Sequence, residues 1–85
     1  MTLVVDASLV VAALVDSGPV GTWAEGCLAR RWHLAAPHLL PVEVANILRR
    51  AVLAGELSAD TASLAHGELA GLRVALYPYA PLAQA

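Results

Sequence analysis

The stretch TLVVDASLVV, residues 2–11, places one carboxylate, Asp6, inside an almost wholly apolar run. Residues 2–6 are rich in valine, which is typical of a strand covered on both faces in a parallel sheet. Residues 9–15 are expected to form a short buried helix, with Ser8 as its N-cap. Burying an ionised carboxylate without a partner is costly. The sequence therefore predicts that Asp6 ends the strand and emerges at the edge of the sheet.

Helical and strand patterns alternate along the rest of the chain. Helices are expected at residues 20–31 and 59–71 and within residues 37–57, where Pro41 marks the start, and strands at residues 32–36 and 73–79. The clearest helix repeats apolar residues at helical spacing: Val44, Ile47, Leu48, Ala51 and Val52. Gly55 is expected to end that helix, and Ser58 to cap the next one. The order β-α-α-β-α-α-β predicts an α/β fold with a central parallel sheet, in a single domain over residues 1–85.

The composition favours a small soluble domain with a partner. Of the 85 residues, 59% are hydrophobic, so an exposed apolar patch is expected. The net charge of −2 gives no strong field toward nucleic acid or an anionic membrane. Cys27, the one cysteine, is expected to be a small buried hydrophobe and cannot form an internal disulfide, which suits a reducing cytosol. The apolar run of residues 3–15 lacks a basic region and is shorter than a bilayer span, so a cytoplasmic location is predicted.

The arginines and tryptophans each allow two interpretations. All five basic residues are arginine, and four form the pairs Arg30–Arg31 and Arg49–Arg50. These pairs are either solvent-facing helix ends or contacts for phosphate, which arginine binds through two parallel hydrogen bonds. Trp23 and Trp32 are expected in the core rather than as platforms for stacking bases.

Two carboxylates are candidates for chemistry. Ligands of open parallel sheets bind beyond the carboxyl ends of the strands, where Asp6 and Glu43 are both expected. Two carboxylates at one edge would repel each other, and a divalent cation such as Mg²⁺ removes that repulsion. Alternatively, each acid simply stabilises a helix N-terminus. Ser8 and Asn46 are the polar residues expected to support Asp6 and Glu43, respectively.

Other sites are not indicated by the sequence. It contains no P-loop, no G-x-G-x-x-G motif and no nucleophile elbow. The three histidines, His33, His38 and His66, lack metal-ligand spacing. A haloacid-dehalogenase-like phosphatase would need a second aspartate two residues after the first, where this chain has Ser8.

Three segments resemble the PIN-domain ribonucleases of the VapC toxin family. They are VVDASLVVAAL at 4–14, APHLLPVEVANILRRAVLAGEL at 36–57 and LRVALYP at 72–78. The resemblance implies a three-layer α/β/α fold and metal-dependent hydrolysis of RNA. Asp6 would bind Mg²⁺ or Mn²⁺ directly, and Glu43 would act on the metal through water or orient the attacking water. Family members are held silent by a VapB-type antitoxin, whose helix would lie against residues 9–15 and 20–31, and they usually dimerise.

The resemblance also implies that further acidic residues and strands are missing. Family members continue past the third strand with a helix that carries a third acid, and a fourth acid follows. This chain has no acid after Glu68, so we expect the N-terminal two-thirds of a PIN-like domain with an incomplete acidic site. Two functions therefore stand open: a ribonuclease, or a non-catalytic module that binds an antitoxin or dimerises.

Overall fold

A parallel three-stranded sheet forms one side of the molecule in the computed structural model, which describes residues 2–29 and 33–78. The strands are β1 (Thr2–Val4), β2 (His33–Pro37) and β3 (Val74–Tyr77), in the order β1-β2-β3. Leu3, Leu34 and Val74 lie side by side in the register. The α/β class and the parallel strands are thus as predicted, whereas Trp32 and Arg30–Arg31 lie outside the described residues.

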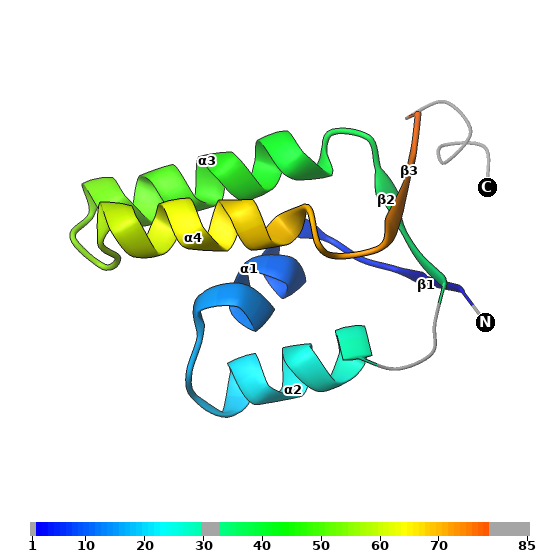
Figure 1. Cartoon of the computed structure of the whole chain (residues 1–85), viewed down its shortest axis with the longest axis horizontal. Helices are drawn as coiled ribbons and strands as arrows, with labels where there is room; N and C mark the ends of the chain where they lie inside the picture. The colour runs from blue at the N-terminus through cyan, green and yellow to red at the C-terminus, as the bar shows by residue number, and fades with distance from the viewer. Residues whose placement is uncertain (1, 30–32, 79–85) are drawn as a thin grey trace.

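Four helices connect and cover the strands. They are α1 (Ala7–Val15), α2 (Pro19–Ala29), α3 (Leu40–Leu53) and α4 (Ala59–Leu69). Figure 1 shows α3 and α4 side by side, with α1 between this pair and α2. The order of elements agrees with the sequence prediction, and the differences lie at the element boundaries.

The prediction that Ser8 caps the first helix is wrong. Asp6 is the N-cap of α1, and its Oδ1 accepts a hydrogen bond of 2.9 Å from the backbone N–H of Leu9. Strand β1 ends at Val4, so Asp6 follows the strand instead of ending it. An aspartate satisfies the free N–H groups of a first turn as well as a serine does, and it does so here two residues earlier.

The second half of the chain forms a helical hairpin with well-defined ends. Helix α3 begins at Leu40, one residue before the predicted start at Pro41, and Pro37 still belongs to β2. Its end is a Schellman motif: Gly55 has a φ of 75° and donates to the carbonyl of Val52, while Glu56 donates to that of Ala51. Ser58 then caps α4, as predicted, by accepting from the N–H of Thr61 at 3.1 Å.

The core lies between the sheet and helices α1, α3 and α4. The apolar face of α3 contributes Leu40, Val44 and Leu48, which are all buried. They pack with Val5 and Val10, both at most 2% exposed. The predicted helical repeat of α3 is therefore the stripe that holds the fold together.

Two predictions about large and small core residues fail. Trp23 is 63% exposed on α2 instead of buried. Cys27, on the same helix, is only partly buried. The buried residues of α2 are Gly21 and Ala24, so α2 packs against α1 through a small-residue face that leaves no room for an indole.

Within the described part of the chain, no single helix combines the length and apolar character that crossing a bilayer requires. Helices α1 and α2 reach that length only when taken together, and they are bent by 112° at the break between them.

Candidate functional site

Asp6 is fixed in position by the start of α1. Its backbone is extended, with φ −108° and ψ 169°, as is usual for an N-cap residue. The backbone N–H of Leu9 donates a hydrogen bond to Oδ1 of its carboxylate. The side chain stays exposed to solvent. Asp6 can therefore cap the helix and present one oxygen to a ligand at the same time.

Glu43 reaches the same place from the next strand along the sheet. It lies in the first turn of α3, and its side chain is exposed. Strands β1 and β2 are parallel neighbours, so α1 and α3, which follow them, begin at the same sheet edge. A pocket of about 320 Å³ lies there, and both carboxylates line it, with the rest of the lining formed by Val4, Val5, Ala7, Pro37 and Leu40.

This pair of carboxylates provides hard oxygen donors on otherwise apolar walls. Protein sites for Mg²⁺ typically use one or two carboxylates and leave the other positions to water and substrate phosphate. Asp6 and Glu43 fit that donor set. In the described part of the chain, no group of three histidine, cysteine or acidic side chains lies close enough to hold a metal ion alone.

The two predicted supporting residues take different places. Ser8 lies beside Asp6 on the lining of a second pocket, on the α2 side of α1. Asn46 is exposed on α3, almost one turn beyond Glu43, and is outside the lining of the pocket that the two acids share. Neither residue forms part of the wall between the two carboxylates.

An apolar groove lies between α1 and α2, next to Asp6. It measures about 380 Å³ and is lined by Val4, Asp6, Ser8, Leu9, Ala12, Val20 and Trp23. Three of these apolar side chains are at least 60% exposed: Val4, Val20 and Trp23. Sequence reasoning missed that Trp23 lines a groove. Trp23 follows Val20 by three residues, a spacing that places both side chains on one side of a helix.

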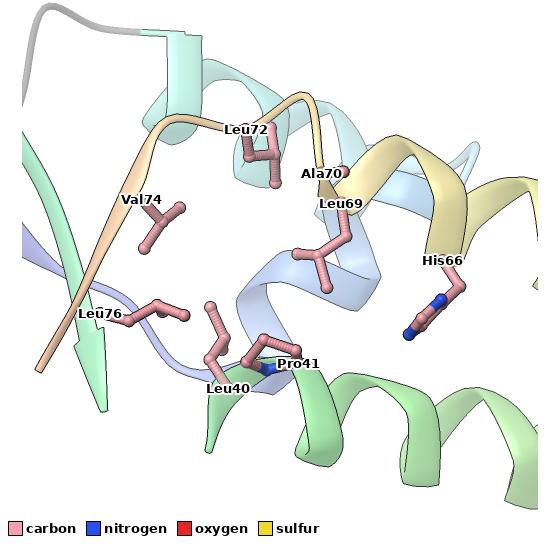
Figure 2. Close-up of a pocket in the computed structure, with 8 residues that line it drawn as sticks. All are labelled: Leu40, Pro41, His66, Leu69, Ala70, Leu72, Val74 and Leu76. Carbon is pink, nitrogen blue, oxygen red and sulfur yellow. The ribbon is translucent and has the colours of Figure 1, made fainter. Parts of the chain in front are cut away.

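A third pocket carries no comparable chemistry. A cavity of about 300 Å³ lies between the start of α3, the end of α4 and β3. Figure 2 shows the side chains that line it. Its walls are leucine, valine, proline and alanine side chains, with His66 at one end. No carboxylate is among its lining residues, and it shares only Leu40 with the pocket of Asp6 and Glu43.

Comparison with known proteins supports the resemblance inferred from the motifs. No family model matches the chain. Two curated relatives, both named Ribonuclease VapC1, come from Mycobacterium tuberculosis strains CDC 1551 / Oshkosh and ATCC 25618 / H37Rv. Each is 42% identical to this chain over 78 residues. The similarity to the VapC family is confirmed.

The aligned region makes up a different share of this chain and of its two relatives. It covers 92% of this chain but only 58% of each VapC1 relative. Because 78 of 85 residues are aligned, the similarity to VapC includes α3, the helix that carries Glu43. What the remaining length of the relatives contributes to their function lies outside this alignment.

Proposed function

We propose that this chain contributes Asp6 and Glu43 to the active site of a metal-dependent endoribonuclease, a toxin of a type II toxin–antitoxin system. The observation that carries the proposal is the pocket that both carboxylates line, from elements 37 residues apart in sequence. The similarity to relatives named ribonucleases supports the same reaction class. The substrate would be cytoplasmic RNA, and the bond hydrolysed would be a phosphodiester.

Each acid has a separate role in this reaction. The hydrogen bond from the Leu9 N–H holds Oδ1 of Asp6 in place, and the carboxylate would bind the cation. Glu43 orients the attacking water and accepts its proton, or holds a metal-bound water in place. Bound Mg²⁺, or Mn²⁺, would neutralise phosphate charge and lower the pKa of its water.

Cleavage of a labelled RNA by the purified chain tests this function. With Mg²⁺ present, we expect cleavage that EDTA stops and that Asp6→Asn and Glu43→Gln each lower by about 100-fold or more. Asp60→Asn is the matched control, because Asp60 is also an exposed acid in the first turn of a helix but lies on α4. Cleavage that persists in EDTA, or that Asp6→Asn leaves intact, would contradict the proposal.

The α1–α2 groove is the proposed contact for a VapB-type antitoxin. It is apolar, exposed and adjacent to Asp6, which suits the apolar face of a partner helix. A helix bound there would also cover the entrance to the acidic pair. Trp23 is the largest exposed side chain of the groove, so Trp23→Ala is expected to weaken antitoxin binding most.

A non-catalytic binding module is the second candidate function. It is favoured by the finding that the described residues hold no group of three metal-ligating side chains. Such a module would use the α1–α2 groove for an antitoxin, or would dimerise, without cleaving RNA. Under this function Asp6→Asn leaves partner affinity unchanged and there is no cleavage to lose, whereas the ribonuclease loses cleavage with the same substitution.

A further inference from the structure

The paired arginines of α3 point to different sides of the helix. Successive residues of an α-helix are rotated by about 100°. Arg49 lines a pocket of about 310 Å³ between α3 and α4, together with Ser63 and His66, and thus faces α4. Arg50 is exposed and is turned from Arg49 by about 100°, away from that pocket. The two arginines therefore serve different surfaces, although they are adjacent in sequence.

Arg50 lies on the same side of α3 as Glu43. Seven residues separate them, which is close to two full turns of 3.6 residues, so their side chains leave the helix along nearly the same line. At a rise of about 1.5 Å per residue, Arg50 is about 10 Å farther along the axis. Asn46, exposed and polar, lies between them near that line. This side of α3 is a polar stripe of Glu43, Asn46 and Arg50 that begins at the acidic pocket.

We propose that Arg50 binds a backbone phosphate of the RNA, next to the phosphate whose bond is cleaved. The RNA chain would then run along this stripe. The inference rests on the proposed ribonuclease function and adds the direction in which the substrate lies. A long polyanion held at the acidic pair must continue across the neighbouring surface. A guanidinium recognises phosphate through parallel hydrogen bonds and retains its charge at any ordinary pH. Contacts of this kind position the strand without reading its sequence.

The position of Arg50 near the end of α3 has a purely structural explanation as well. A cation in the last turn of a helix interacts favourably with the negative end of the helix dipole. That role would make Arg50→Gln lower the stability of the chain without changing how RNA binds. Arg49→Gln is the matched control, because it removes the same charge from the same helix end but on the α4 side.

RNA binding as a function of salt concentration tests the proposal. Fluorescence anisotropy with labelled oligoribonucleotides of several sequences is measured in EDTA, so that metal-dependent cleavage does not interfere. Arg50→Gln is expected to weaken binding about two- to fivefold for every sequence, the range of one exposed ion pair. It is also expected to reduce the slope of log K against log salt by about 0.7. Arg49→Gln is expected to change both the RNA affinity and the salt slope by less than Arg50→Gln does.

The outcomes separate this proposal from the proposed function. Equal losses for Arg49→Gln and Arg50→Gln, or a slope that Arg50→Gln leaves unchanged, overturn the contact while the ribonuclease assignment stands. RNA binding that depends on Arg50, in a chain that cleaves no RNA with Mg²⁺, overturns the ribonuclease and supports the contact. A wild-type chain that binds no RNA in EDTA and cleaves none with Mg²⁺ overturns both.

Discussion

Asp6 combines a structural and a chemical role at one residue. Its Oδ1 caps α1, and its carboxylate also lines the pocket shared with Glu43. The sequence indicated the carboxylate and its place at the edge of the sheet, but predicted it as the last residue of the strand. It offered the capping bond only as an alternative role of Asp6, because the serine two residues later is an equally good N-cap by type. Which of the two caps the helix depends on where the strand ends, and a run of valines and leucines does not define that end.

Substitutions at Asp6 can separate the two roles. Asparagine caps a helix about as well as aspartate, so Asp6→Asn is expected to change the free energy of unfolding by less than about 0.5 kcal/mol. Asp6→Ala removes the cap as well and is expected to cost about 1 kcal/mol. Chemical denaturation of both variants measures this difference. A large destabilisation by Asp6→Asn would mean that its loss of activity reports unfolding rather than lost chemistry.

Among the elements, α3 was predicted best and α2 least well. The repeat of Val44 and Leu48 fits only a helix with one buried side, and the structure confirms that side. Helix α2 buries only Gly21 and Ala24 and exposes its tryptophan. A hydrophobic residue on a helix contacts either the core or a partner, and periodicity alone does not distinguish these two environments.

The apolar stripe of α3 should dominate the stability of this helix. Leu48 is 3% exposed, so Leu48→Ala is expected to cost about 2–5 kcal/mol through lost burial and a residual cavity. Leu53, near the end of the same helix, is 73% exposed, and Leu53→Ala is expected to stay within about 0.5 kcal/mol. Thermal or urea unfolding compares the two. Similar losses at both positions would contradict the orientation of α3.

The turn between α3 and α4 depends on one glycine. Gly55 adopts a φ of 75°, so Gly55→Ala is expected to destabilise the chain by about 1–2 kcal/mol. Gly67 lies inside α4 with open space where a Cβ would be, so Gly67→Ala is expected to stabilise by about 0.5–1 kcal/mol. The two alanine variants therefore change the midpoint of unfolding in opposite directions. A shift of the same sign in both would contradict the described hairpin.

At the scale of the whole molecule, much apolar surface faces solvent. Among the described residues, β1 and β3 each have a single neighbouring strand. Side chains such as Val4, Leu64 and Leu76 are at least 44% exposed. Open strand edges and apolar patches favour association with another chain. The α/β class followed from the alternation of patterns in the sequence, and an exposed apolar patch was expected from the composition. The structure shows which side chains form the exposed surface.

We therefore expect the chain to form an oligomer on its own. Size-exclusion chromatography with light scattering, over a dilution series, is expected to give a mass above that of one chain of 8.8 kDa. Added antitoxin is expected to change that mass by binding the α1–α2 groove. A monomer at every concentration, with a sharp thermal transition, would contradict this expectation.

The central claim is that Asp6 and Glu43 share one divalent cation, and paramagnetic Mn²⁺ tests it most directly. In amide NMR spectra, substoichiometric Mn²⁺ is expected to broaden the signals around both acids together. Asp6→Asn is expected to weaken Mn²⁺ binding about tenfold or more and to remove the broadening at Glu43 as well. Broadening around only one of the two acids, or around neither, would contradict the claim.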